Sequence, residues 1–222
     1  MGSAIRGGDK MVTAYKISAR ASLPLTIDCR SYRFTGLVYT RQDPFDELLF
    51  LLHGNVESQR APLVRLHSAC LTGDALGSAR CDCQHQLRFS LREIVTAGQG
   101  VLLYLSTHEG RGIGLGNKIR AYALQEQGLD TVDANLQLGL EVDRRSYDGA
   151  AQALLDQGLR AISLISNNPK KIEALRCAGI DVVRRISTPG GITDTNRRYI
   201  ETKRRRMLHL FENIDIDNTS RP

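Results

Sequence analysis

Three of the five cysteines lie close together: ten residues separate Cys70 from Cys81, and one separates Cys81 from Cys83. Thiolate sulfur is a soft ligand that favours zinc over hard cations such as Mg2+. A structural zinc site has four protein ligands, whereas a catalytic site has three and keeps one position for water. Three histidines could supply a fourth ligand: His67, His85 and His108. The spacing predicts a zinc site, with a closed structural site and simple buried thiols as alternatives.

Two features beside these cysteines support a metal site. Asp82 lies between two of the predicted ligands and Arg80 directly before them, where such groups orient thiolates and tune their basicity. Residues 72–74 (TGD) are turn-forming, and a turn there brings Cys70 back towards the other two cysteines. The intervening segment is therefore expected to form a loop around the metal.

Two predicted strand-to-helix junctions are suited to bind an anion. Residues 109–118 (EGRGIGLGNK) are glycine-rich and basic, and residues 166–171 (SNNPKK) place a hydroxyl and two lysines at a helix start. Backbone amides at such junctions bind phosphate, helped by the helix dipole. The glycine spacing fits neither a P-loop nor a dinucleotide-binding fingerprint. Two junctions in one chain favour a polyphosphate ligand, with a plain flexible loop as the alternative for the first.

A third polar segment, Asp143-Arg144-Arg145, lies in the connection before a helix that is predicted from Tyr147. Connections on a rigid scaffold often carry catalytic side chains. Taken alone, this sequence is most typical of a salt-bridged surface turn.

Periodicity predicts the elements that must position these groups. Antiparallel strands are expected within 25–52 and at 64–67, and alternating helices and strands follow through the second half. No structure is assigned to residues 1–20. The later predictions are helices at 86–97, 117–127, 147–157, 170–178 and 198–211, and strands at 100–105, 161–165 and 180–183. The expected fold is α+β, with mixed sheets and flanking helices in one domain at 23–211, between flexible segments 1–22 and 212–222.

Composition restricts the setting and the partners. An odd cysteine count suits a reducing compartment. No stretch is long and apolar enough to span a membrane, and no signal-peptide pattern is present, so the cytoplasm is the expected location. The net charge of +6 favours acidic partners, and the basic run 203–206 is typical of a solvated helix end. Aromatic residues make up only 5% and no basic segment is interleaved with them, which disfavours a nucleic-acid binder with structural zinc.

Five segments together resemble GTP cyclohydrolase II, in an order and spacing similar to that family from about residue 23 to 211. They are 65–74 (RLHSACLTGD), 78–83 (SARCDC), 109–115 (EGRGIGL), 117–122 (NKIRAY) and 167–171 (NNPKK). The resemblance implies a homodimeric enzyme with one zinc ion per subunit, and Mg2+ on the GTP phosphates. It would convert GTP to a diaminopyrimidinone ribosyl phosphate, formate and pyrophosphate, in the first committed step of riboflavin synthesis.

The same resemblance assigns roles to residues. The zinc ligands would be the three clustered cysteines, Asp143 the proton acceptor, Arg145 the nucleophile towards the α-phosphate, and Tyr122 a residue near the reacting base. Because guanidinium stays protonated at neutral pH, stabilisation of transition-state charge is an alternative role for Arg145. The positions matching GTP-binding residues are Arg65, Leu66, His67, Ser68, Ala69, Gln86, Glu109, Gly110, Arg111, Thr131, Ser166 and Lys171.

The sequence also departs from the family pattern. Ala69 stands where glutamate is usual, Gln84 where glycine is usual, and Ser166 where threonine is usual. The loop at 105–111 (LSTHEGR) is one residue longer than the usual Arg-Gln-Glu-Gly-Arg loop, and it lacks the first arginine and the glutamine. We therefore expect intact zinc and ring-opening machinery. Affinity or nucleotide preference is expected to differ, and a formamidopyrimidine product or a specialised pathway is the alternative.

Overall fold

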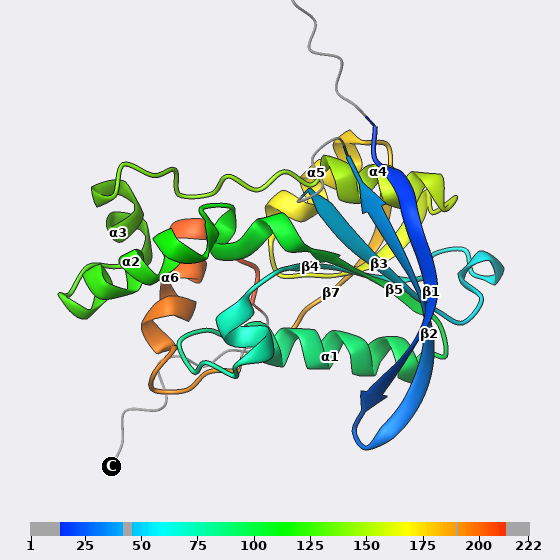
Figure 1. Cartoon of the computed structure of the whole chain (residues 1–222), viewed down its shortest axis with the longest axis horizontal. Helices are drawn as coiled ribbons and strands as arrows, with labels where there is room; N and C mark the ends of the chain where they lie inside the picture. The colour runs from blue at the N-terminus through cyan, green and yellow to red at the C-terminus, as the bar shows by residue number, and fades with distance from the viewer. Residues whose placement is uncertain (1–13, 42–45, 190, 212–222) are drawn as a thin grey trace, which may run out of the picture.

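A computed structural model describes residues 14–41, 46–189 and 191–211. Seven strands in these residues form one mixed sheet in the order β1-β2-β3-β5-β4-β6-β7 (Figure 1). Strands β1, β2, β3 and β5 pair antiparallel, whereas β4, β6 and β7 extend the sheet from β5 by parallel pairing. The strands are β1 (Lys16–Ile27), β2 (Arg30–Thr40), β3 (Glu47–His53), β4 (Leu63–Ser68), β5 (Gly100–Leu105), β6 (Ala161–Ile165) and β7 (Asp181–Ile186). The predicted α+β class is confirmed.

Two strand predictions need correction. The strand predicted at 64–67 is present as β4, but it is parallel to β5 and β6 and does not belong to the antiparallel region. Helix α1 (Cys83–Thr96) connects β4 to β5, and such a crossover makes neighbouring strands parallel. Strand β1 begins at Lys16, within the segment given no structure. The side chains of residues 16–22 are exposed, so this part of β1 carries no burial pattern and is held by pairing with β2.

Helices cover both faces of the sheet (Figure 1). On one face, Leu87 and Leu91 of α1 pack with Leu102 of β5. On the other face, α4 (Asp148–Asp156) and α5 (Pro169–Cys177) pack against the alternate side chains of β5, including Leu103. This two-sided burial explains the continuous apolar sequence of β5, which the sequence correctly marked as a buried strand.

Three helices lie together beyond the carboxyl ends of β4, β5 and β6 (Figure 1). They are α2 (Gly114–Glu126), α3 (Thr131–Gln137) and α6 (Arg197–Met207). Helix α3 was not predicted, although Asp130 caps it by accepting hydrogen bonds from two backbone amides. Helix α6 ends four residues before its predicted end because Leu208 adopts a left-handed conformation.

The predicted terminal flexibility concerns 1–13 and 212–222, which lie outside the described residues, and also 14–22, most of which belongs to β1. Among the helices of the described ranges, none has the length and apolar character needed to cross a membrane.

Candidate functional site

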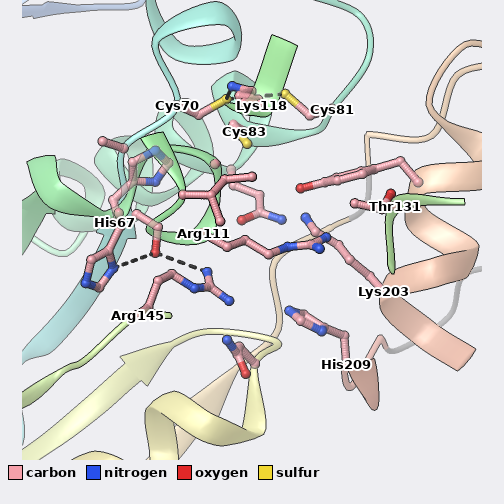
Figure 2. A pocket seen from close by; sticks show the side chains of 18 of the residues that line it. His67, Cys70, Cys81, Cys83, Arg111, Lys118, Thr131, Arg145, Lys203 and His209 are labelled. Carbon is pink, nitrogen blue, oxygen red and sulfur yellow. Dashed lines mark hydrogen bonds between the residues drawn. The ribbon is translucent and has the colours of Figure 1, made fainter. Parts of the chain in front are cut away.

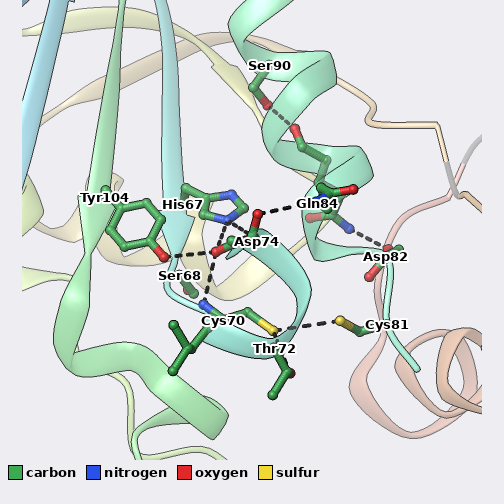
Figure 3. Close-up of polar contacts among 12 residues, drawn as sticks. His67, Ser68, Cys70, Thr72, Asp74, Cys81, Asp82, Gln84, Ser90 and Tyr104 are labelled. Atoms are coloured by element: carbon green, nitrogen blue, oxygen red, sulfur yellow. Dashed lines mark hydrogen bonds and ion pairs between the residues drawn. The ribbon is translucent and has the colours of Figure 1, made fainter. Parts of the chain in front are cut away.

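The three predicted metal ligands meet between β4 and α1. Their sulfur atoms all lie within 4.8 Å of one another, and Cys70 Sγ is 3.7 Å from Cys81 Sγ (Figures 2 and 3). Gly73 permits this approach. A Cβ atom there would lie 2.7 Å from Cys81 Sγ and 3.0 Å from Cys70 Sγ, closer than packing allows. The backbone at position 73 therefore passes so close to the sulfurs that only glycine fits there.

An aspartate fixes the loop between the ligands. Asp74 accepts hydrogen bonds from the backbone amide of Cys70, from His67 Nε2 and from the Tyr104 hydroxyl, each at 3.0 Å (Figure 3). Burial lowers the pKa of His67, so its imidazole is neutral and donates to Asp74 from Nε2. The turn predicted at 72–74 is thus anchored to β4 and β5 and returns the chain towards Cys81.

The cluster is suited to a soft divalent cation. Hydrogen bonds from the neighbouring thiols and from Lys118 lower the pKa of Cys70, and the Lys118 ammonium lies 3.0 Å from its sulfur. The charge and hydrogen bonding of Cys70 then raise the pKa of Cys81 to about 11. A bound divalent cation would displace the thiol protons and stabilise the thiolates that replace them. No histidine among the described residues joins the group of possible ligands, which favours the open, three-ligand arrangement.

The cysteines form one end of a pocket whose lining is strongly cationic (Figure 2). The described residues that line it include no aspartate or glutamate. Both terminal nitrogens of Arg111 are buried without a hydrogen-bond partner in the described part of the chain. The lining cations are Arg65, Arg111, Lys118, Arg145, Lys171 and Lys203. Such a lining selects an anionic ligand with several negative charges.

Lys171 lies among several of these positive charges. Burial, together with the nearby Arg65, Arg145 and Lys203, lowers the pKa of Lys171 well below its usual value. Its Nζ atom donates a 2.7 Å hydrogen bond to the carbonyl oxygen of Leu66. A phosphate in the pocket would favour the charged form of Lys171 by offsetting its positive neighbours.

Asp143 and Arg145 are not on an exposed turn, although Arg144 between them is exposed. Asp143 binds Arg145 through two hydrogen bonds, and both side chains are less than a tenth exposed. Although burial opposes ionisation, these contacts lower the pKa of Asp143 to about 2. Arg145 lines the pocket, whereas Asp143 lies behind it. In this arrangement the Asp143 carboxylate orients Arg145.

The structure brings most of the predicted site residues together. Those lining the pocket are Arg65, His67, Ser68, Ala69, Cys70, Cys81, Cys83, Gln86, Gly110, Arg111, Tyr122, Thr131, Arg145, Ser166 and Lys171. Three others do not line it: Leu66, Glu109 and Asp143. Leu66 belongs to the core, and its backbone oxygen holds Lys171. Glu109 accepts a 2.8 Å hydrogen bond from Lys118, so it holds a lining residue from outside.

Sequence reasoning missed several lining residues. Asn135 comes from the unpredicted α3, and Tyr199, Lys203 and His209 come from α6 and the segment after it. Lys203 was interpreted as part of a solvated basic run, but its side chain is only 10% exposed. Its spacing of four residues from Tyr199, which puts both on one helix face, was the available signal.

Fold and site together define an α+β protein with a cluster of three cysteines at the end of a cationic pocket. Residues 20–187 match the family described as GTP cyclohydrolase II. The chain is 47% identical over 183 residues to GTP cyclohydrolase-2 of Streptomyces coelicolor, covering 82% of each protein. The chain therefore belongs to the GTP cyclohydrolase II family.

Other relatives are longer proteins. Over 189 residues the chain is 50% identical to Monofunctional riboflavin biosynthesis protein RIBA 3, chloroplastic, of Arabidopsis thaliana, covering 85% of this chain and 36% of that protein. Over 168 residues it is 53% identical to Riboflavin biosynthesis protein RibBA of Chlamydia trachomatis, covering 76% of this chain and 40% of the relative. The chain thus spans well under half the length of these two relatives.

Proposed function

We propose that this protein is a zinc-dependent GTP cyclohydrolase II. It would hydrolyse GTP, open the imidazole ring of guanine, and release formate and pyrophosphate to leave a diaminopyrimidinone ribosyl phosphate. The observation that carries the proposal is the meeting of three cysteine sulfurs with a pocket lined by six basic side chains, in a chain of this family. One zinc ion per subunit fits the cluster, because its three donors are soft sulfurs and Gly73 leaves them room.

The metal would be held by Cys70, Cys81 and Cys83. When bound, zinc supplies Lewis acidity and lowers the pKa of a water molecule to about 7. The guanine base would lie at this end of the pocket, which Tyr122 lines. The Lys118 ammonium lies 5.8 Å from the centre of the Tyr122 ring. Gln86, held by Arg65 through a 2.7 Å hydrogen bond, offers an amide to the nucleotide.

The triphosphate, with Mg2+, would occupy the cationic part of the pocket. Arg111 has free hydrogen-bonding capacity on its buried terminal nitrogens, and Lys171 gains charge stabilisation from any phosphate beside it. Arg145 is held rigidly by Asp143 and would stabilise negative charge at the α-phosphate as pyrophosphate leaves. This preorganised contact supports the charge-stabilising role of Arg145 over a nucleophilic one. Although burial opposes the charged form, the hydrogen bonds to Asp143 raise the guanidinium pKa above its usual value.

A second product is favoured by one feature of the site. The altered loop places His108 against the pocket, where it contacts Ser68 at 3.2 Å, and Ala69 contributes no carboxylate beside it. A family member with this changed wall could stop at a formamidopyrimidine or serve a specialised pathway. Retention of the formyl group in the product is the distinguishing property.

The deciding experiment uses the reduced, zinc-loaded protein with GTP and Mg2+. Formate and pyrophosphate assays, with mass spectrometry of the nucleotide, are expected to give one equivalent of each and a deformylated monophosphate. A product that keeps the formyl mass would establish the diverged reaction instead. Absence of both turnover and bound zinc would contradict the two proposed reactions. It would favour a protein that binds nucleotides without catalysis.

The remaining proposals concern organisation. We propose that residues 23–211 form the catalytic domain, that the protein works as a homodimer in the cytoplasm, and that it binds neither nucleic acid nor membrane. Light scattering of the full chain, with and without GTP, tests the dimer. Salt-dependent oligonucleotide binding would contradict the proposal on nucleic acid.

A further inference from the structure

A buried ion pair joins helix α6 to the turn that carries two of the cysteine sulfurs. Lys203 Nζ lies 2.6 Å from Asp82 Oδ1, although the residues are 121 positions apart. Their side chains are 10% and 0% exposed, so solvent hardly screens the attraction. The ammonium also lies 4.5 Å from the centre of the Tyr199 ring. Lys203 thus points inward, while the arginines at 204–206 on the same helix are exposed.

Asp82 lies where its carboxylate acts directly on the ligand-bearing turn. It stands between Cys81 and Cys83 and immediately precedes α1. An aspartate at such a helix start commonly accepts a hydrogen bond from the amides of the first turn, but the Asp82 side chain does not. Its two oxygens are taken by Lys203 and by Gln86, at 2.6 and 2.5 Å. The carboxylate therefore links the turn to α6 and does not cap the N-terminus of α1.

The hydrogen bonds of Gln86 continue this network to Arg65 and the sheet. Gln86 accepts a 2.7 Å hydrogen bond from Arg65 Nη2, and Arg65 Nη1 donates to the carbonyl oxygen of Ile165 at 3.1 Å. Lys203, Asp82, Gln86 and Arg65 thus form one continuous network between α6, the metal-binding turn and the sheet. Of these four residues, only Asp82 does not line the pocket.

Loss of the Lys203 ammonium would leave a buried carboxylate without its counter-charge, next to the three cysteines. An unpaired buried charge is strongly unfavourable, so the turn must rearrange until water reaches Asp82. Rearrangement of this turn displaces the sulfurs of Cys81 and Cys83, because they are the residues on either side. A contact that merely anchored α6 would have no such effect on the metal centre.

We propose that Lys203 is a positioning residue of the metal centre: by holding Asp82 it fixes the turn that carries Cys81 and Cys83. The inference rests on the zinc-dependent function proposed above. Helix α6 lies outside the family match at residues 20–187, so the match does not account for it. Groups that orient metal ligands typically change metal affinity or activity about 10–100-fold when removed.

The test compares three variants of the full chain. Lys203→Met removes the ammonium and keeps most of the side-chain length, Lys203→Arg keeps a positive charge, and Arg204→Met removes the same charge from the next, exposed position. Each protein is loaded with zinc or Co2+. The rate of zinc transfer to a chromophoric chelator and the cobalt–thiolate absorption spectrum are then measured. We expect Lys203→Met to release zinc roughly 10–100-fold faster and to change the cobalt spectrum. Lys203→Arg should restore most of both properties, and Arg204→Met should match the wild type.

Zinc release at the wild-type rate from Lys203→Met, with an unchanged cobalt spectrum, would overturn the inference even if thermal stability fell. Should Lys203→Met fail to fold, Asp82→Asn takes its place, because it keeps the side-chain shape and removes the charge that Lys203 holds. Wild-type zinc retention in Asp82→Asn would equally overturn the inference. Failure of the wild-type chain to bind zinc would instead refute the proposed zinc-dependent function, so the two failures are distinguishable.

Discussion

Asp143 accepts two parallel hydrogen bonds from Arg145: Arg145 Nε donates to Oδ1 at 2.8 Å and Arg145 Nη2 donates to Oδ2 at 2.9 Å. The remaining terminal nitrogen, Nη1, lies 3.3 Å from Ser68 Oγ. The guanidinium is therefore held from two sides with its plane set before any nucleotide arrives. Geometry of this kind favours electrostatic stabilisation of developing charge, since no reorganisation is needed during the reaction.

Replacement of Arg145 by lysine should lower kcat about 100-fold with little change in KM, because a point charge cannot reproduce the two-sided hold. Asp143→Asn should reduce kcat in the same direction by a smaller factor. Steady-state kinetics of pyrophosphate release measures both. Arg144→Lys, at an exposed neighbouring position, is the matched control and should behave as wild type. An unchanged kcat in Arg145→Lys would contradict the role given to Arg145.

Gly73→Ala should disrupt the metal centre, because the added Cβ would lie 2.7 Å from Cys81 Sγ. We expect substoichiometric zinc in the purified variant, measured by elemental analysis, and a corresponding loss of formate release. Gly116→Ala is the control, since only a flexible arginine end lies near its added Cβ and its backbone needs no left-handed conformation. Full zinc occupancy in Gly73→Ala would show that the loop accommodates the methyl group.

His108 should make the protein less stable in mild acid. Burial and the charges of Arg145 and Lys171 lower the pKa of His108 to about 3, against about 6.5 in an unfolded chain. Between these values the unfolded chain binds a proton that the folded protein does not. The free energy of unfolding therefore decreases as pH falls below about 6.5, by up to about 1.4 kcal/mol per pH unit from this group.

His108→Gln removes this contribution of His108 to the pH dependence of stability. Between about pH 7 and pH 5, its free energy of unfolding should decrease by about 2 kcal/mol less than that of the wild type, as measured by urea denaturation. Comparison of the two proteins under the same conditions cancels the pH dependence of metal binding. Parallel pH dependences would mean that His108 titrates normally in the folded protein.

Removal of the metal should separate chemistry from nucleotide binding. Cys81→Ser, or treatment of the wild type with a chelator, should abolish formate release, since the proposed water activation is lost. Binding of GTP, measured by calorimetry, should largely persist because the lining cations at the phosphate end remain. Cys177→Ser changes an exposed cysteine and should leave both properties intact. Formate release by metal-free protein would contradict the zinc requirement.

The sequence predicted those parts of the fold that rest on local patterns. Residues 86–97 and 100–105 show the periodicities of an amphipathic helix and a buried strand, and both elements are present as α1 and β5. The direction of β4 was wrong because an apolar run carries no information about strand orientation. The first part of β1, residues 16–22, was missed because it is held by pairing with β2, which its exposed side chains do not reveal.

In the site, too, the residues that depend on local spacing could be predicted and those that depend on distant contacts could not. The cysteines could be found from spacing because all three lie within one connection of the chain. Lys203 could not be distinguished from the basic residues that follow it, since its burial depends on Asp82, far away in the sequence. Asp143 and Arg145 were assigned by resemblance alone. Their sequence is that of an ordinary surface turn, and only packing against β4 makes their ion pair part of a pocket.

The short connection that carries all three cysteines has a consequence for biosynthesis. The three sulfurs lie within a loop of residues 70–83, whose closure costs little chain entropy. The opposite wall of the pocket, by contrast, includes side chains from residues 197–211, which are synthesised about 120 residues later. During translation, the three cysteines thus emerge together, well before the helix that completes the pocket and holds Asp82.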